Sequence, residues 1–267
     1  MENRIPKVIH YCWFGGNPLP PLAEKCIASW RKYLPDYEIK RWDESNFDVN
    51  IIPYTKQAYE AKKYAFVSDY ARFWILYNYG GLYFDTDVEV IRSMDDIVAA
   101  GPFMGCENSY KTGATPNELG VAPGLDLGVN PGLGLGVNPG LGLYKEIIGL
   151  YVNLQFTGTD NKLNLKTVVE YVTELLCKKG FQNKDGIQSI CGVNIYPRDF
   201  FNPKDYETGN IIITNNTRTI HHFAASWMPP RAKYGSVVNR WIIKMVGLSA
   251  SRKLVGFYYR YIYKYLK

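Results

Sequence analysis

The first forty-two residues predict a β–α–β unit, and this unit limits the chain to folds in which helices pack on a sheet. Residues 5–14 (IPKVIHYCWF) are β-branched and aromatic, and they run into the turn-forming sequence Gly15-Gly16-Asn17-Pro18. Residues 21–34 carry apolar side chains at helical spacing, and Pro35 ends that pattern. Residues 37–42 then alternate as a second strand. We therefore expect an α/β fold.

The composition supports a packed domain rather than a disordered or membrane-spanning chain. Of 267 residues, 46% are hydrophobic and 21% are charged, which is enough apolar material for a core. The chain has no run of about 18 apolar residues, so we expect no transmembrane helix. The five cysteines are an odd number without a C-x-x-C pair, which favours free thiols in a reducing cytoplasm over a disulfide framework or a zinc site.

A helix, a glycine pair and a strand are predicted in the next informative segment. Residues 66–79 show the helical pattern, with Ser68 as a candidate N-cap, and Gly80-Gly81 closes the helix. The following residues, 82–91, predict one continuous strand. Further helices are predicted over residues 144–155 and 166–179, and late strands over 211–213 and 219–222.

Four polar side chains in this segment form the strongest candidate site. Asp69 and Arg72 are three residues apart on the predicted helix and share a face. Asp85 and Asp87 are two apart on the predicted strand and project from the same side. Two neighbouring carboxylates repel each other unless a cation lies beside them, and oxygen ligands suit Mg²⁺ or Mn²⁺ completed by substrate phosphates. By itself, the Asp-x-Asp pair also fits a solvated strand end.

Three histidines are present, and two of them are adjacent. His221 and His222 lie on a predicted late strand, so they point to opposite faces and only one can face a cleft. His10 lies within the first strand, where we expect a buried, hydrogen-bonded ring rather than a ligand. No Ser/His/Asp set with a nucleophile elbow occurs, so we assign no catalytic base.

Three sequence blocks carry a resemblance to a known family. Residues 5–16, 68–72 and 80–87 together resemble glycosyltransferase family 32, and they are similar to the catalytic domain of the clostridial glucosylating toxins. The resemblance returns at residues 221–227. It implies a GT-A-like nucleotide-sugar-binding fold, with a central mixed sheet flanked by helices. It also implies a retaining, metal-dependent transfer of a hexose from a nucleotide sugar, here expected to be UDP-linked.

The resemblance implies donor-binding roles for five residues. Trp13 would stack on the nucleobase, unless it is a core tryptophan. Asp69 and Arg72 would bind the donor sugar and its phosphate, the alternative being a simple ion pair on the helix surface. Ser68 would contact the ribose or only cap the helix, and Tyr83 would donate to the phosphates or only pack.

The resemblance also implies a cation site that binds Mn²⁺ or Mg²⁺. Asp87 would be the direct ligand, and Asp85 would be the carboxylate nearest the donor sugar and ribose. His222 would be a further ligand, although the toxins have a carboxylate at that place. Trp227 would donate its indole N–H to the β-phosphate, and Ser226 would complete the surrounding shell.

One stretch does not map onto the family. Residues 124–131 (GLDLGVNP) are followed by residues 132–139 (GLGLGVNP), a period of eight that is too short for a solenoid. Each Asn-Pro-Gly favours a turn. We interpret the tract as an expanded surface loop at about residues 120–143, with a segment that shapes the site as the alternative.

The C-terminal segment is basic. Glu207 is the last acidic residue, and ten Lys or Arg residues follow it, so the first 207 residues carry a net charge of −4 within the total of +6. We expect a catalytic domain over residues 1–230 and a basic amphipathic helical segment over 231–267. We expect a cytoplasmic protein in which that segment binds the anionic surface at the inner face of the cell membrane. The alternative is that the segment packs on the domain. No motif indicates nucleic acid.

These observations predict a cytoplasmic glycosyltransferase that acts on a polysaccharide or lipid-linked oligosaccharide acceptor, as in capsular polysaccharide biosynthesis. Two other hypotheses stay open at this point. A haloacid-dehalogenase phosphatase would use Asp85 as nucleophile and Asp87 as acid/base, although that motif normally follows the first strand. A non-catalytic nucleotide-sugar-binding module would use the same residues without turnover.

Overall fold

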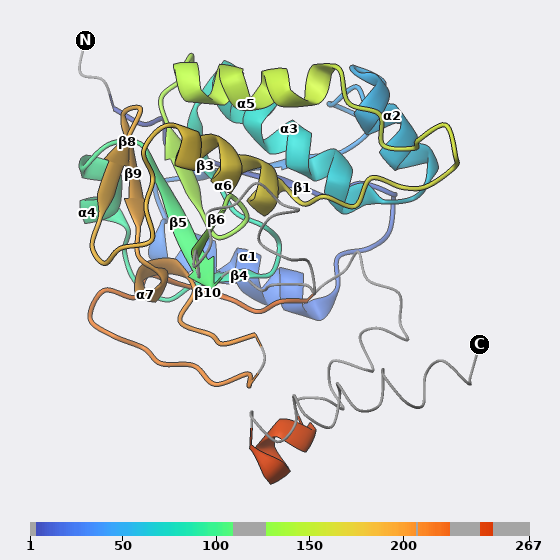
Figure 1. Cartoon of the computed structure of the whole chain (residues 1–267). Coiled ribbons are helices and arrows are strands. Elements are labelled where there is room, and N and C mark those ends of the chain that lie inside the picture. Colours follow the sequence, from blue (N-terminus) through green and yellow to red (C-terminus); the bar gives the residue numbers. More distant parts are fainter. Residues whose placement is uncertain (1–3, 109–126, 207, 225–240, 248–267) are drawn as a thin grey trace. The chain divides into compact units, whose positions relative to one another are not determined.

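A computed structural model describes residues 4–108, 127–206, 208–224 and 241–247 (Figure 1). The chain divides into two compact units. The first comprises Met1–Pro203 and Ile213–His222, and the second comprises Lys204–Ile212 and Phe223–Lys267. The domain boundary predicted between residues 230 and 231 lies outside the described residues.

The first unit is built on a mixed sheet of eight strands. They are β1 (Val8–Cys12), β2 (Glu38–Trp42), β3 (Gly81–Tyr83), β5 (Phe103–Asn108), β6 (Leu127–Asn130), β7 (Leu135–Val137), β8 (Gln188–Ile190) and β9 (Val193–Tyr196). The order is β2-β1-β3-β7-β5-β9-β8, and β6 also pairs with β5. The pairs β1–β2, β1–β3 and β5–β9 are parallel and the others are antiparallel. A second sheet joins β4 (Val88–Val90) to β10 (Thr219–His221) in antiparallel register.

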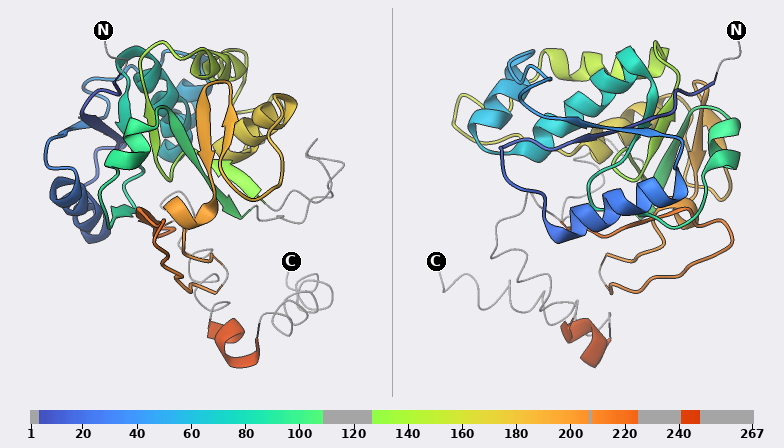
Figure 2. Two further views of the ribbon diagram at one scale, coloured as in Figure 1. Left: turned by 90° about the vertical axis from the view of Figure 1, so that its left-hand side faces the viewer. Right: turned by 180° about the vertical axis from the view of Figure 1, so that it is seen from behind.

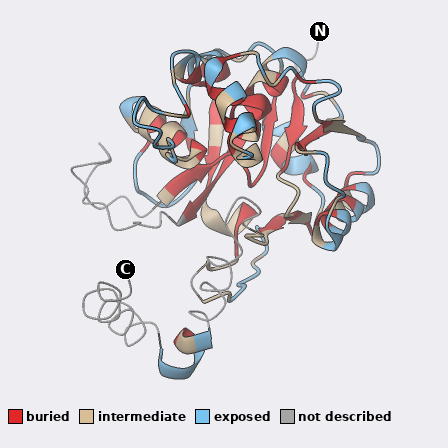
Figure 3. Cartoon of the chain, turned by 90° about the vertical axis from the view of Figure 1, so that its right-hand side faces the viewer, coloured by how far each residue is buried: buried red, intermediate tan, exposed pale blue. Residues whose placement is uncertain are grey.

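Helices cover both faces of the large sheet (Figures 1 and 2). One face packs against α2 (Pro53–Glu60), α3 (Tyr64–Tyr79), α5 (Gly142–Val152) and α6 (Val168–Lys178). The other packs against α1 (Pro21–Tyr33), α4 (Asp95–Ala99) and α7 (Arg198–Phe201). The buried strands lie between helices whose outer surfaces are exposed (Figure 3). This mixed sheet flanked by helices confirms the predicted α/β class, and helices α1, α3, α5 and α6 lie where they were predicted.

The alternation of side chains in β3 explains how one short strand serves both layers. Leu82 and Phe84 pack into the core on the α1 side, whereas Tyr83 packs into the core on the α3 side. α3 itself is apolar on nearly every side, and nine of its sixteen residues are buried. The helix ends at Gly80, whose φ of +65° suits glycine and whose missing side chain leaves room for Pro139.

His10 is a buried, hydrogen-bonded residue, as predicted. Its Nδ1 accepts a hydrogen bond from Trp42 Nε1 at 3.0 Å, which leaves Nε2 to donate to the Gly80 carbonyl at 3.0 Å. Burial lowers the pKa of His10 to about 4, outweighing the bond to Gly80. The neutral ring therefore ties β1 to β2 and to the start of β3.

Three local predictions are wrong. Ser68 lies inside α3, whose N-cap is Lys63, and its hydroxyl donates to the Tyr64 carbonyl at 3.2 Å. The predicted strand 82–91 is two strands, because the chain turns between Tyr83 and Val88. The triplet 211–213 is exposed and forms only an isolated bridge, between Ile211 and Lys204.

The glycine-rich repeat is not a surface loop, which corrects our interpretation. Where the repeat is described, residues 128–137 are buried and supply β6 and β7 of the large sheet. An added Cβ at Gly136 would lie 2.1 Å from the Phe103 ring, and one at Gly128 would lie 2.9 Å from Val169. Glycine is needed in the repeat because neighbouring side chains occupy the space that a side chain would fill.

The second unit is described in short pieces. Residues 241–246 are helical, with Ile243 buried and Trp241 and Met245 exposed at 67% and 68%. Tyr206 and Phe223 meet edge to face, with ring centroids 5.2 Å apart. Within the described parts of the chain, no helix is both long and apolar enough to cross a bilayer.

Candidate functional site

Helix α3 places Asp69 and Arg72 together at the carboxyl ends of β1 and β3. Arg72 Nη2 donates to Asp69 Oδ1 at 2.8 Å, and Arg72 Nε donates to the Ser68 carbonyl at 3.1 Å. Asp69 is 8% exposed and Arg72 is 3% exposed. The predicted pairing on one helix face is thus present, but as a buried ion pair rather than the surface pair that was its alternative.

Asp85 is held by groups from two elements. Arg72 Nη1 lies 3.3 Å from Asp85 Oδ2, and the Tyr83 hydroxyl donates to Asp85 Oδ1 at 3.0 Å. The guanidinium also lies over the Tyr83 ring, 5.0 Å from its centroid. Tyr83 is fully buried and its hydroxyl is hydrogen-bonded to Asp85, so of its two predicted roles the structure shows packing in the core. Because the chain turns after β3, Asp85 faces Arg72 whereas Asp87 is directed elsewhere.

Burial and charge together set the ionisation of this group. Burial raises the pKa of Asp69 to about 7; Arg72 opposes the shift and Asp85 adds to it. Burial works against the charge of Arg72, but Asp85, Tyr83 and Asp69 outweigh it and raise the pKa of the guanidinium. Arg72 therefore stays charged and neutralises the carboxylates on either side of it.

The two late histidines contact different carboxylates. His221 Nε2 lies 3.3 Å from Asp87 Oδ1, whereas His222 Nε2 lies 2.7 Å from Glu89 Oε2. Lys25 of α1 also binds Glu89, at 2.9 Å. Burial lowers the pKa of His221, but the surrounding carboxylates outweigh it and raise the value to about 9. The His221 side chain, rather than that of the predicted His222, thus lies against the Asp87 carboxylate, whereas the His222 amide donates to the Asp87 carbonyl at 2.9 Å.

Three further residues, none of which was predicted as a site residue, lie at the same site. Asn130 Nδ2 donates to Glu107 Oε2 at 2.8 Å, and Asn130 Oδ1 accepts from the Gly132 amide at 2.7 Å. The Gly132 carbonyl accepts from the Asp85 amide at 3.1 Å. Burial raises the pKa of Glu107; His221, Asn130 and Arg198 oppose the shift. The Asn-Pro-Gly sequence predicted this turn, but no sequence pattern indicated Glu107.

Trp13 lies just beyond the end of β1 and is half-buried. Its indole Nε1 donates to the Asn17 carbonyl at 2.7 Å, which fixes the ring against the Gly15-Gly16 turn. β1 and β3 are parallel, with His10 opposite Tyr83. Trp13 and Asp85 therefore leave the sheet at the same edge, where ligands of α/β sheets bind.

Residues 20–104 match the family model described as "Glycosyltransferase sugar-binding region containing DXD motif". The matched residues include Asp69, Arg72, Tyr83, Asp85 and Asp87. This part of the chain is similar to the sugar-binding region of DXD-type glycosyltransferases. The Asp85-Thr86-Asp87 sequence is its DXD motif, and the match does not favour the haloacid-dehalogenase hypothesis.

Two curated proteins similar to part of this chain come from Schizosaccharomyces pombe (strain 972 / ATCC 24843). Inositol phosphoceramide mannosyltransferase 3 is 32% identical over 127 residues, which are 45% of this chain and 34% of that protein. Inositol phosphoceramide mannosyltransferase 1 is 28% identical over 113 residues, which are 38% of this chain and 34% of that protein. The chain thus spans about a third of the length of these relatives.

Two solved structures are similar to this chain. The PaToxG glycosyltransferase is 18% identical, with a TM-score of 0.47, and covers 66% of this chain and 70% of that one. The galactosyltransferase LgtC, in complex with donor and acceptor sugar analogues, is 14% identical, with a TM-score of 0.45. That match covers 90% of this chain and 96% of that one.

The DXD side chains suit a cation that is completed by its substrate. Among the residues with described positions, no three His, Cys, Asp or Glu side chains converge as a metal cage. Mg²⁺ and Mn²⁺ do not need one, because one or two carboxylates with substrate phosphates are a common ligand set. The oxygens of Asp85 and Asp87 fit that chemistry. Ser226 and Trp227, predicted beside the phosphates, lie outside the described residues.

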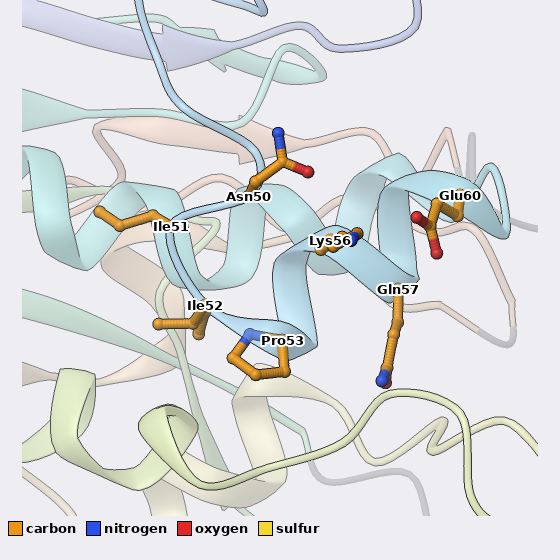
Figure 4. A pocket seen from close by; sticks show the side chains of 7 residues that line it. All are labelled: Asn50, Ile51, Ile52, Pro53, Lys56, Gln57 and Glu60. Carbon is orange, nitrogen blue, oxygen red and sulfur yellow. The ribbon is translucent and has the colours of Figure 1, made fainter.

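A separate hollow of about 440 Å³ lies at the start of α2 (Figure 4). It is lined by Asn50, Ile51, Ile52, Pro53, Lys56, Gln57 and Glu60. The Gln57 amide is already engaged, because its oxygen accepts from the amides of Phe156 and Thr157. None of the DXD, arginine or histidine side chains lines this hollow, so we assign it no part in the chemistry.

Proposed function

We propose that the chain is a glycosyltransferase that moves a hexose from a nucleotide sugar to a hydroxyl group of an acceptor. The observation that carries the proposal is the buried Arg72, which bridges Asp69 and Asp85, the first carboxylate of the DXD motif. Burying a network of charged groups costs free energy, because the charges lose their hydration. The position of this network at the carboxyl edge of the sheet, where ligands of α/β sheets bind, supports a functional role for it. The mannosyltransferase relatives support the reaction class.

In this proposal the donor lies across the carboxyl ends of β1 and β3 in a GT-A-like site. Trp13 stacks on the nucleobase, for which we propose uracil. Asp69 accepts hydrogen bonds from the sugar hydroxyls, and Arg72 orients Asp69 and Asp85 while contributing positive charge. Asp85 is the carboxylate next to the sugar and ribose. Ser226 and Trp227 stay predictions for contacts to the diphosphate, as does a ribose contact for Ser68.

Asp87 and Asp85 would hold a divalent cation, Mn²⁺ or Mg²⁺, together with oxygens of the diphosphate. A bound cation supplies Lewis-acid stabilisation of the negative charge on the leaving nucleoside diphosphate. We propose His221 as the histidine beside this site, in place of the predicted His222, because the His221 ring lies against the Asp87 carboxylate and the His222 ring lies against Glu89. His221 would add positive charge when protonated and a nitrogen ligand when neutral.

The reaction exchanges one bond at the anomeric carbon for another. The bond between that carbon and the phosphate oxygen breaks, and a bond to the acceptor oxygen forms with retention of configuration. The departing diphosphate carries the electron pair and accepts the proton of the acceptor hydroxyl. Arg72 keeps Asp69 and Asp85 in place during the exchange, which is positioning rather than proton transfer.

For the acceptor we propose a polysaccharide or lipid-linked oligosaccharide, of the kind used in capsule formation, at the cytoplasmic face of the cell membrane. The support is the C-terminal sequence, which has ten Lys or Arg residues after Glu207 and no carboxylate. Cationic and tyrosine-rich segments adsorb to anionic lipid surfaces.

The decisive experiment measures nucleoside diphosphate release from a panel of UDP-, GDP- and TDP-hexoses, with Mn²⁺ or with a chelator. We expect release from one donor, and a loss of about 100-fold in Asp87→Asn because cation binding contributes several kcal/mol. Asp36→Asn is the matched control, since Asp36 forms an exposed pair with Lys7. Phosphate release from a simple monoester, or equal donor turnover by Asp87→Asn, would contradict the proposal.

The membrane component has its own test. Full-length protein and a variant ending at residue 248 are sedimented with vesicles of anionic or of zwitterionic lipid. We expect only the full-length chain to sediment, and only with anionic vesicles, whereas donor hydrolysis is the same for both. Equal sedimentation of the shortened chain refutes this component and leaves the transferase proposal intact.

A further inference from the structure

The segment between β6 and β7 is a large bulge in an otherwise continuous antiparallel pairing. Asn130 lies opposite Gly105, and Gly136 lies opposite Phe103. Six steps along the repeat therefore face only two steps along β5, and the excess chain leaves the sheet at residues 131–134. Bulges of this kind redirect backbone and side chains next to active sites.

The bulge lies against the first carboxylate of the DXD motif. The Asp85 amide donates to the Gly132 carbonyl at 3.1 Å, and an added Cβ at Gly132 would lie 2.0 Å from Asp85 Oδ2. Gly132 thus forms a wall against Asp85 Oδ2, the carboxylate oxygen that Arg72 also contacts. The position of this wall decides where the carboxylate can lie.

Two buried polar side chains hold the bulge in place. Asn130 accepts from the Gly132 amide and donates to Glu107, and these residues are 8% and 9% exposed. A well-packed apolar pair would fill the same volume without desolvating a carboxylate. A fully hydrogen-bonded polar pair instead specifies one geometry, which an apolar pair does not. The hydrogen bonds form a continuous path Glu107–Asn130–Gly132–Asp85, so the geometry that the polar pair specifies also determines the surroundings of Asp85.

We propose that Glu107 and Asn130 are positioning residues for the glycosyl transfer, because they fix the Gly132 wall that sets the place of Asp85. This inference rests on the proposed transferase function. Neither side chain is assigned a covalent or proton-transfer step. Glu107 acts as a hydrogen-bond acceptor for Asn130, and Asn130 acts on Asp85 through Gly132.

The test exploits the direction of the hydrogen bonds. Asn130→Ala removes both bonds, and Asn130→Asp sets two carboxylates against each other. We expect each to lower kcat/KM by about 100-fold, the effect of a catalytic group displaced by about 1 Å. Adding Glu107→Gln to Asn130→Asp places an amide donor opposite the new carboxylate, which still accepts from the Gly132 amide. We expect this double variant to recover at least tenfold of the loss.

Thr173→Val is the matched control. It removes another buried hydrogen bond to β6, from the Val129 amide to Thr173 Oγ1 at 2.9 Å, away from Asp85. We expect a loss of stability in urea without the loss in kcat/KM. Wild-type kcat/KM in Asn130→Ala, or no recovery in the double variant, overturns the inference.

Hydrogen exchange of the Asp85 amide separates this inference from the proposed function. Its protection should fall in Asn130→Ala and Asn130→Asp and return in the double variant, whether or not the wild-type chain turns over any donor. Protection that is unchanged in all variants refutes the path to Asp85. A wild-type chain inactive on every donor refutes the transferase function alone.

Discussion

Gly132→Ala adds a single methyl group at the point where the repeat meets the DXD motif. The new Cβ would lie 2.0 Å from Asp85 Oδ2 and 3.0 Å from Asn130 Oδ1. Contacts of a Cβ closer than about 3 Å are essentially absent from folded proteins, so the Asp85 carboxylate must retreat by about 1 Å. Gly132 is not among the glycines with positive φ, so its backbone accepts alanine and the conflict is confined to side chains.

This retreat disturbs both bonds that hold Asp85. Arg72 Nη1 lies 3.3 Å from Asp85 Oδ2, already long for an ion pair with a hydrogen bond, and the Tyr83 hydroxyl lies 3.0 Å from Oδ1. A displacement of about 1 Å in a catalytic group costs about 100-fold in rate. Overpacking of a well-filled site costs about 1–3 kcal/mol in the free energy of unfolding. We therefore expect a large loss of kcat/KM with a moderate loss of stability.

The assay pairs steady-state nucleoside diphosphate release with urea unfolding at 25 °C. Gly142→Ala is the control, because Gly142 begins α5 in the same glycine-rich tract and an added Cβ meets nothing within 4 Å. That substitution should leave kcat/KM unchanged and slightly raise the urea midpoint, since alanine is favoured in a helix by up to about 1 kcal/mol. If Gly132→Ala keeps kcat/KM within threefold of wild type, the carboxylate tolerates the methyl group and our reasoning about the wall is wrong.

Three further predictions follow from the buried ionisable side chains. Arg72→Gln should lower the free energy of unfolding by about 3–5 kcal/mol in urea titrations, because two carboxylates then lose their buried partner; a change below about 1 kcal/mol contradicts this. His221→Ala should weaken nucleoside diphosphate binding in Mn²⁺ by about 10–100-fold, and more than His222→Ala does, as measured by calorimetry; the reverse order would favour His222. The pKa of His10 is lowered from 6.5 to about 4, so the unfolded chain binds its proton first as pH falls. Stability attributable to His10 is complete above pH 6.5 and falls by about 3 kcal/mol between pH 6.5 and 4; His10→Gln should lose that part of the pH slope in urea midpoints.

The elements that depend on local sequence pattern were predictable. Helices α1, α5 and α6 each have a periodicity that matches one apolar face, and that face is buried in the structure, whereas α3 is apolar on nearly every side and was predictable from its length and the glycine pair that ends it. The Asp69–Arg72 pair was predictable for the same reason, because helical spacing alone brings the two side chains together.

The failed predictions depend on contacts between distant segments. A glycine-rich sequence is ambiguous, because the lack of side chains is equally compatible with a mobile loop and with the close approach of two chain segments. Only the three-dimensional neighbours, such as Phe103 at Gly136 and Asp85 at Gly132, show which case applies. Of our two interpretations of the repeat, a surface loop and a segment that shapes the site, the second agrees better with these neighbours. Glu107 gave no signal at all, since its role depends on pairing with Asn130 across two strands.

The turn between β3 and β4 explains why two carboxylates only two residues apart have different surroundings. On one continuous strand, Asp85 and Asp87 would face the same side and share the same partners. The turn instead leaves Asp85 with Arg72, Tyr83 and the Gly132 wall, all fixed by the core. The Asp87 carboxylate instead lies against His221, which belongs to β10. Under the proposed function, the first carboxylate is held rigidly where the sugar would be oriented. The second has a titratable partner where the charge of the diphosphate would be balanced, so the break in the strand within the DXD motif would let the two carboxylates take different roles.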